Sequence, residues 1–167
     1  TRPREERMRI HHVTPYFHPE IGGLEESVKR FASWQAERGN EVVVHTLSFT
    51  STWEPLPASD QIDGVTIRRY PPVVRRGYYR TWFRPDLDGA DLIHLHGYAV
   101  RTNDRGARNA AGKPRVYSLH HGVRMPHPTW THRLLRRGYD YMVGFRTLRL
   151  VDRILVASHG DVSWLTR

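Results

Sequence analysis

FHPEIGGLEESVKRFASWQAERGNEVVVHTLS, residues 17–48, is the stretch of sequence that decides the fold. Two adjacent glycines, Gly22 and Gly23, come directly before a segment with helical periodicity. The positions that recur at helical spacing on its apolar face are Leu24, Val28, Phe31, Trp34 and Gln35 or Ala36. Gly39 and Asn40 predict the end of that helix. The near-continuous apolar run EVVVHTLS after them is typical of a strand that a parallel sheet buries on both faces.

The flanking sequence repeats this alternation of strand and helix. MRIHHV at 8–13 predicts a strand, so strand, glycine loop, helix and strand form one βαβ unit. Further strands are predicted at 65–70, 90–97, 114–122 and 152–158, and helices at 99–112 and 129–150. The pattern predicts a loop or hairpin from residue 50 and leaves the helix content of 50–89 unassigned. We therefore expect an α/β fold, a doubly wound parallel sheet with helices on both faces.

Composition sets the class of protein. The chain has 167 residues, 38% of them hydrophobic, which suits one domain with a core. Its 26 Lys and Arg residues against 17 Asp and Glu give a net charge of +9, which favours an anionic partner such as nucleic acid, a phosphorylated substrate or a membrane surface. Cysteine is absent, which excludes disulfides and thiolate nucleophiles. Without a secretory signal or an apolar run of roughly 18 residues, we expect a cytoplasmic protein.

The recognisable motifs all follow predicted strands, where a doubly wound sheet binds its ligands. Gly22 and Gly23 lie at a strand-to-helix turn, where free backbone N–H groups and the helix dipole can receive a phosphate. The alternative is that the two glycines only permit a tight turn, and the residues alone leave both interpretations open.

Histidines form the second group of motifs. His94 and His96 are two apart on one predicted strand and share a face, while His120 and His121 end the next strand. Four histidines at adjacent strand ends suggest zinc, but no carboxylate within these runs completes a usual ligand set. The alternative is that one or two imidazoles bond a substrate oxygen or phosphate while His94 is buried and structural. We assign structural roles also to His11, His12 and His45.

Several motifs in a fixed order carry a family resemblance. They are Pro19 with Gly22, Gly23 and Glu25; Arg38 with Gly39; Asp91 to Gly97; Lys113 to Gly122; and Asp152 to Ser158. This set resembles the amino-terminal half of the GT-B glycosyltransferases of group 1, also called family 4. The resemblance covers nearly the whole chain.

The resemblance implies a Rossmann-like, acceptor-side domain at 8–167 after a flexible extension at 1–7. It further implies retaining, metal-independent sugar transfer from a nucleotide-sugar donor to a sugar or lipid-linked acceptor, with no cofactor beyond that co-substrate. The donor-binding carboxyl-terminal domain of the family has no counterpart in this sequence. We therefore expect the chain alone to be inactive.

Individual roles also follow from the resemblance. Gly22 and Gly23 match the loop near the donor diphosphate, and His121 matches the family histidine that approaches the sugar. His120 is the alternative, because the doubled histidine blurs the alignment by one residue. The remaining candidate residues for binding donor phosphate or substrate are Glu20, His96, Gly97, Tyr98, Gly122 and Ser158.

Other interpretations remain open. A sugar-nucleotide epimerase shares the fold, and a basic nucleic-acid-binding module would explain the charge, although no motif of that class is present. The segments VVRRGYYRTWFR and HRLLRRGYDYMVGFRTLR place arginines beside aromatic and apolar residues. They suit an anionic membrane surface at the cytoplasmic face, or else a core with a solvated basic face.

Overall fold

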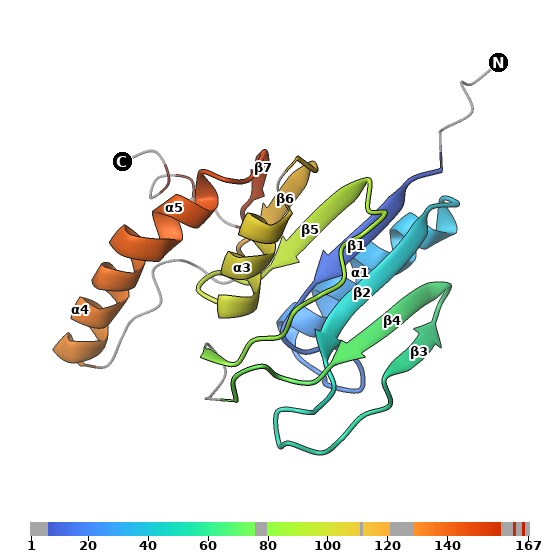
Figure 1. Ribbon diagram of the computed structural model, residues 1–167, viewed down its shortest axis with the longest axis horizontal. Coiled ribbons are helices and arrows are strands. Elements are labelled where there is room, and N and C mark those ends of the chain that lie inside the picture. Colours follow the sequence, from blue (N-terminus) through green and yellow to red (C-terminus); the bar gives the residue numbers. More distant parts are fainter. Residues whose placement is uncertain are drawn as a thin grey trace.

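The computed structural model describes residues 7–75, 80–110, 112–120 and 129–157, together with residues 162 and 165. Within these residues one seven-stranded sheet has the order β3-β4-β2-β1-β5-β6-β7 (Figure 1). The strands are β1 (Arg9–Val13), β2 (Glu41–Leu47), β3 (Ser59–Ile62), β4 (Val65–Tyr70), β5 (Leu92–His96), β6 (Arg115–Ser118) and β7 (Arg153–Leu155). All neighbouring strands are parallel except β3 and β4. The predicted α/β fold with a doubly wound parallel sheet is confirmed.

Helices cover both faces of the sheet. They are α1 (Gly23–Glu37), α3 (Arg101–Asn109), α4 (Trp130–Tyr139), the π-helical turn η1 (Asp140–Gly144) and α5 (Phe145–Leu148). In Figure 1, α1 lies behind the sheet and α3 in front of it. Helix α4 runs through η1 into α5, so the predicted helix at 129–150 is confirmed as one segment with a widened turn. No helix among the described residues is long and apolar enough to cross a bilayer.

The buried face of α1 differs from the predicted one. Leu24, Val28 and Ala32 are its buried residues, while Phe31 and Trp34 are 40% and 52% exposed. The stripe at every fourth position packs on the apolar side chains of β2 and β4. Phe31 instead lies over the edge of the His94 ring, at 5.6 Å between centroids. Phe31 therefore lies at the margin of the packing face, whereas the prediction that Trp34 belongs to this face was wrong, because the helix meets the sheet along that narrower stripe.

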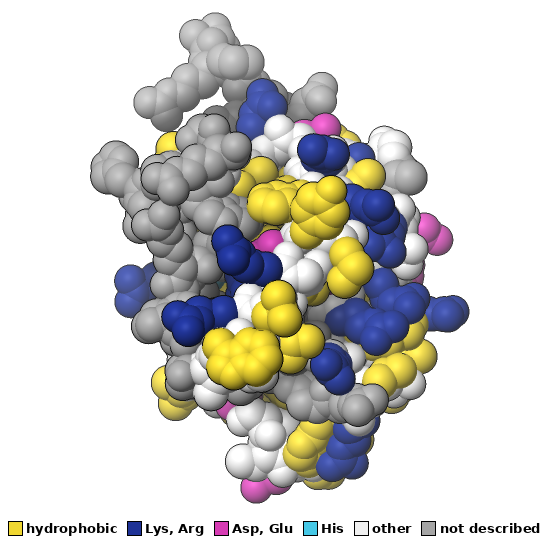
Figure 2. Space-filling view, turned by 90° about the vertical axis from the view of Figure 1, so that its left-hand side faces the viewer, with side chains coloured by type: hydrophobic (Ala, Val, Ile, Leu, Met, Phe, Trp, Pro, Cys, Tyr) yellow, Lys and Arg dark blue, Asp and Glu magenta, His cyan; other side chains and the backbone are white. Residues whose placement is uncertain are grey.

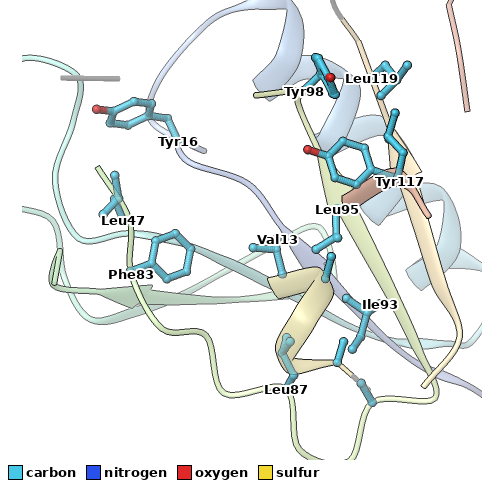
Figure 3. Close-up of a cluster of buried hydrophobic side chains, with 14 residues drawn as sticks. Val13, Tyr16, Leu47, Phe83, Leu87, Ile93, Leu95, Tyr98, Tyr117 and Leu119 are labelled. Atoms are coloured by element: carbon cyan, nitrogen blue, oxygen red, sulfur yellow. The ribbon is translucent and has the colours of Figure 1, made fainter. Parts of the chain in front are cut away.

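The region 50–89 contains the hairpin that the sequence suggested. Strands β3 and β4 pair antiparallel, and Asp63 and Gly64 at the turn have φ of 51° and 77°. Aspartate followed by glycine is a favoured pair for a tight turn with positive φ at both positions. Among the described residues of 50–89, no helix has a defined start and end. Phe83 and Leu87 of this region are buried in the core on the α3 side of the sheet (Figure 3).

The carboxyl-terminal strands are shorter than predicted. Strand β6 ends at Ser118 and β7 at Leu155, against predicted ends at residues 122 and 158. Leu119 still bonds the β7 side, through its N–H to the Leu155 carbonyl at 3.0 Å. His120 then has φ of 52°, which lies outside the range of a strand. The backbone therefore leaves the sheet at the first of the two adjacent histidines.

Candidate functional site

Three loops with predicted roles meet at one edge of the sheet. Strands β1, β5 and β6 are adjacent and parallel, so the Gly22–Gly23 loop, Gly97 and His120 all follow carboxyl ends of neighbouring strands. Gly97 lies against the start of α1, because a Cβ on it would be 3.6 Å from Cδ2 of Leu24. The predicted convergence of these loops is confirmed for the described residues.

The glycine pair lies where the chain enters α1. Gly22 has φ −167° and ψ 170°, an extended backbone that any residue adopts, and a Cβ on it would meet the flexible carboxylate of Glu25. A Cβ on Gly23 would have no atom within 4 Å. Neither glycine is demanded by a left-handed backbone, so the turn alone does not explain the pair. The first turn of the helix also carries Glu25 and Glu26, which already offset the helix dipole.

Gly97 is required by the backbone at the end of β5. Its φ of +92° lies in the left-handed region that favours glycine. Its carbonyl accepts hydrogen bonds from the side chains of Asn103 and Tyr117, both at 2.9 Å, and its N–H bonds the Ser118 carbonyl at 2.9 Å. Gly97 therefore has a fixed position between β5, β6 and α3.

Asn103 is a site residue that the sequence reasoning missed. Its amide also donates to the carbonyl of His96, and the side chain is fully buried. The sequence does indicate buried polar residues here, because the segment RTNDRGARN contains no large apolar residue. If this helix packs on the sheet, it must bury some of its polar groups. Asp104, next to it, is buried as well and accepts bonds from the hydroxyls of Tyr139 and Thr147. That buried carboxylate anchors α4 and α5 to α3, and its burial raises its pKa.

The α1 face of the sheet carries a chain of histidines. Nε2 of His12 is 2.7 Å from Oε1 of Gln35, and its Nδ1 is 2.8 Å from Nε2 of His96. Nδ1 of His96 is 2.8 Å from Nε2 of His120. His94 lies beside this chain and bonds Oγ of Ser118 at 2.7 Å through Nε2. These hydrogen-bonded side chains run from α1 across the central strands β1 and β5 to the carboxyl edge of the sheet.

Burial keeps these imidazoles neutral. His12 and His96 have no exposed surface and His94 has 3%. Desolvation lowers the pKa of His12 to about 4 and that of His94 to about 2, and it lowers the pKa of His96 well below its ordinary value. Near neutral pH each ring therefore has one donor and one acceptor nitrogen. The prediction that His94 is buried and satisfied is confirmed.

A separate pair of histidines, His11 and His45, lies on the face of the sheet opposite to α1. Nε2 of His45 is 3.1 Å from Nδ1 of His11, and its Nδ1 is 2.8 Å from the Tyr70 hydroxyl. Burial lowers the pKa of His45 to about 3. These bonds join β1, β2 and β4 inside the core, which confirms a structural role for His11 and His45.

A metal is the alternative use of the first cluster. Potential ligand atoms of His12, His94 and His96 lie within 4.8 Å of one another. Both ring nitrogens of His12 and of His96 already have hydrogen-bond partners. Since a bound cation would have to break these short bonds, the geometry fits a hydrogen-bonded cluster better than a metal centre.

Two further candidates make contacts that stabilise loops. The carboxylate of Glu20 accepts bonds from N and Oγ of Ser51 at 2.6 and 3.1 Å, which joins the glycine loop to the loop after β2. Tyr98 is 5% exposed and donates its hydroxyl to Asp140 at 2.9 Å. Gly144 permits this contact, because a Cβ there would overlap the Tyr98 hydroxyl. The candidates His121, Gly122 and Ser158 lie outside the described residues.

Comparisons with known proteins agree with this architecture. A family model for glycosyltransferase family 4 matches residues 21–167. The chain is 37% identical over 128 residues to a GDP-mannose:cellobiosyl-diphosphopolyprenol alpha-mannosyltransferase of Xanthomonas oryzae pv. oryzae, covering 69% of this chain and 32% of that protein. A protein of the same name from Komagataeibacter xylinus is 32% identical over 99 residues, covering 55% and 24%. The chain spans about a third or less of the length of the curated relatives that it matches.

Solved structures support the fold independently. A sucrose-phosphate synthase from Thermosynechococcus elongatus superposes with a TM-score of 0.63 at 14% identity, over 96% of this chain and 45% of that one. An alpha,alpha-trehalose 6-phosphate synthase from Burkholderia multivorans gives 0.54 at 16% identity, over 96% and 41%. The family model matches most of the chain, and the order of the strands and the loops at the carboxyl edge of the sheet agree with it. The chain therefore belongs to glycosyltransferase family 4.

Proposed function

We propose that the protein carrying this chain transfers a sugar, with retention and without a metal, from a nucleotide-sugar donor to a sugar or lipid-linked acceptor. The observation that carries the proposal is the meeting of the Gly22–Gly23 loop, Gly97 and His120 at the carboxyl edge of the sheet. Ligands of open α/β sheets bind at this edge. Membership of family 4 supports the reaction class.

The donor side of the proposal rests on the glycine pair. Because Gly23 has no atom of the chain within 4 Å of an added Cβ, there is room for a ligand to approach the backbone. In our proposal the donor diphosphate approaches Gly22 and Gly23. His121 faces the sugar, with His120 as the alternative, and His96 and Gly97 hold that edge in place. Glu20 and Tyr98 act indirectly, through the loops that their hydrogen bonds fix.

A lipid-linked diphosphate is the acceptor class that we favour. The relatives are named for GDP-mannose and cellobiosyl-diphosphopolyprenol, an acceptor that combines a glycan, a diphosphate and a polyprenyl chain. In this chain, Arg105 stacks on Trp82 with its guanidinium 3.8 Å from the ring centroid, and Arg84 and Arg101 lie 5.7 and 6.0 Å from it. Within the described part of the chain no ion pair links these arginines to a carboxylate. The cluster suits the phosphates of such an acceptor.

An anionic membrane surface fits the exposed side of α4. Figure 2, which faces the side of the molecule where α4 lies, shows apolar side chains next to basic ones. Trp130, Leu134 and Leu135 are 62–68% exposed, and Arg133 and Arg137 lie among them. The other segment behaves differently: Trp82 and Phe83 are buried, which confirms the core interpretation for those two rings, while Arg76, Tyr78 and Tyr79 lie outside the described residues. We therefore place the proposed membrane contact on α4.

The test is a transfer assay with the full-length protein. Radiolabelled GDP-mannose and other nucleotide sugars are supplied with a glycosyl-diphosphopolyprenol, with a free oligosaccharide, or with no acceptor. Sugar transfer that requires an acceptor and retains the anomeric configuration supports the proposal. Conversion of the sugar nucleotide without acceptor would instead identify an epimerase. A chelator is expected to leave the rate unchanged.

A further inference from the structure

Arg69 is an arginine that the fold buries almost completely. It lies one residue before the end of β4, and only 1% of its side chain is exposed. Val65 and Ile67 precede it at alternate positions of the strand and pack against α1, so Arg69 lies on the same face of the sheet. A buried guanidinium needs partners for its charge and its N–H groups. The partners of Arg69 therefore show what this side chain holds in place.

The guanidinium of Arg69 joins two loops at the carboxyl edge. Nη2 donates to the carbonyl of His18 at 2.8 Å, and Nη1 donates to the carbonyl of Pro57 at 3.2 Å. His18 lies in the loop that leads to Gly22 and Gly23, and Pro57 lies in the loop between β2 and β3. The carboxylate of Asp60, 3.4 Å from Nη2, balances the charge. One side chain thus links the main chain of the glycine loop to that of its neighbour.

Other contacts hold the glycine loop close to the same point. Phe17 is 3% exposed and packs in the core next to α1. The carboxylate of Glu20 bonds Ser51 of the neighbouring loop, as described above. The main chain is therefore held at residues 17, 18 and 20, directly before the two glycines. A Cβ on Gly23 would still meet no atom within 4 Å, so the segment is fixed while space for a ligand is kept.

Packing alone does not explain an arginine at this position. An apolar side chain of similar size would fill the same space without burying a charge, and such replacements are often neutral or stabilising. Among the described residues, the buried Nε of Arg69 also has no hydrogen-bond partner, which adds to the cost of burial. The bonds to the two loop carbonyls are what an apolar residue could not provide.

We propose that Arg69 is a positioning residue for sugar transfer: through the carbonyl of His18 it fixes the glycine loop, and with it the backbone that receives the donor diphosphate. This inference rests on the function proposed above. Because almost none of its side chain is exposed, Arg69 acts through the main chain and does not touch the donor. A misplacement of about 1 Å can lower a rate on the order of 10²-fold, so the position of this loop matters for transfer.

Hydrogen exchange of the full-length protein tests the link between the loops and needs no activity. Arg69→Met keeps a long side chain but removes every donor. We expect faster exchange in peptides that cover residues 16–24 and 48–54, where the amides of Glu20 and Ser51 are hydrogen-bonded. Exchange in α3, which Arg69 does not contact, should stay as in the wild type.

Arg115→Met is the matched control. Arg115 begins β6 at the opposite edge of the sheet, donates Nη1 to the carbonyl of Ala107 at 2.8 Å and pairs with Asp152 at 4.0 Å. It thus makes the same kinds of contact as Arg69 but none with the glycine loop. Its variant should lower the melting temperature and leave exchange in both loops unchanged.

Steady-state kinetics separate positioning from stability. In Arg69→Met we expect kcat/KM for the nucleotide sugar to fall on the order of 10-fold while KM for the acceptor is unchanged. Arg115→Met should keep both values. Arg69→Lys keeps the charge but not the planar fork that reaches two carbonyls, so its loss should be smaller, and it decides the question if Arg69→Met does not fold. The losses of Arg69→Met and Gly23→Val should not add in the double variant, because both act through one loop.

The outcomes distinguish this inference from the proposed function. Wild-type loop exchange in a folded Arg69 variant would overturn the inference even in a protein that transfers sugar. Faster exchange with unchanged donor kinetics, or additive losses with Gly23→Val, would show that Arg69 only stabilises the fold. Faster loop exchange in a protein that transfers no sugar would keep the link between the loops and remove the proposed function.

Discussion

Two glycines at the carboxyl edge differ in whether the backbone conformation requires a glycine. Gly97 has a left-handed backbone and a carbonyl with two side-chain donors, so the protein needs glycine there. Gly23 has neither constraint. A glycine that the fold does not require is better explained by an approaching ligand, and the two positions therefore respond differently to substitution.

Gly97→Ala tests the first of these positions. A non-glycine residue held at φ of +92° costs about 1–3 kcal/mol, which lowers the melting temperature. Gly112→Ala is the matched control, because its φ is +82° and an added Cβ meets nothing within 4 Å. We expect similar losses of melting temperature but a loss of sugar transfer by the full-length protein only for Gly97→Ala. Equal activity of the two variants would show that Gly97 does not hold the site.

The sequence predicted which loops meet at the carboxyl edge but not the contacts inside them. The placement of Gly22, Gly23, His96 and Gly97 was predictable because they lie at or after strand ends, and the carboxyl ends of parallel strands meet at one edge. Asn103 and Asp104 were missed because a buried polar residue in a helix is indistinguishable by type from one that faces solvent. Whether such a residue is buried depends on which face the tertiary packing selects.

At the scale of secondary-structure elements, local pattern and tertiary packing determine different features. Strand β4 was predicted with its observed bounds, 65–70, and the helix from Leu24 to the turn at Gly39 agrees with α1 within one residue at its start. The periodicity did not decide which stripe of α1 packs, because Phe31 and Ala32, three and four residues after Val28, both lie next to it on the helix surface. The ends of β6 and β7 depend on how far β6 pairs with the edge strand β7, which the sequence does not encode locally.

Helix α4 exposes three large apolar side chains, those of Trp130, Leu134 and Leu135. We expect the full-length protein to sediment with vesicles containing anionic lipid, and added salt to weaken this binding by screening the arginines. Arg133→Gln with Arg137→Gln, or Leu134→Ser with Leu135→Ser, should reduce binding without lowering the melting temperature, because both leucines are more than 60% exposed.

The control for α4 is Arg30→Gln. Arg30 is an exposed arginine on α1 that pairs with Glu26 at 3.0 Å, so the variant also removes one positive charge. Its vesicle binding should match that of the wild type. Equal sedimentation with neutral and anionic vesicles, or equal losses in Arg30→Gln and the α4 variants, would rule out α4 as a membrane-binding helix.

The buried histidines make the central strands sensitive to acid. The pKa of His12 is lowered from 6.5 to about 4 and that of His45 to about 3, so the unfolded state binds more protons between pH 6.5 and these values. Their stabilising effect is complete above about pH 6.5 and is lost as the pH falls, by up to about 1.4 kcal/mol per pH unit for each ring. The pKa of Asp104 is raised, which acts in the opposite sense, but His11, His94 and His96 add to the histidine effect.

Hydrogen exchange measures this effect locally. In the full-length protein, amide protection of β1 and β5, corrected for the intrinsic exchange rate, should fall between pH 7.5 and pH 5. In His12→Gln, the slope of the opening free energy against pH should correspond to about one proton fewer than in the wild type. This holds whether or not the substitution changes the opening free energy itself. Protection that is constant across this range would mean that the histidines are not held neutral in the fold.

At the scale of the whole molecule, the fold brings the glycine and histidine motifs at its strand ends to one edge of the sheet, and it places an apolar and basic surface on the side of α4. In our proposal the first feature receives the activated sugar, and the second contacts an anionic membrane surface. The two together connect the fold to the reaction class of family 4. The central claim is that the glycine loop at the carboxyl edge receives the donor.

The most direct measurement is the steady-state rate of sugar transfer by the full-length Gly23→Val variant. A Cβ added at Gly23 meets no atom within 4 Å. We therefore expect an unchanged melting temperature together with a loss of transfer on the order of 10²-fold, because the donor phosphate is displaced from the backbone. Ile21→Ala, at a side chain that is 98% exposed in the same loop, controls for a local disturbance and should keep its rate. Wild-type kinetics in Gly23→Val would contradict the account.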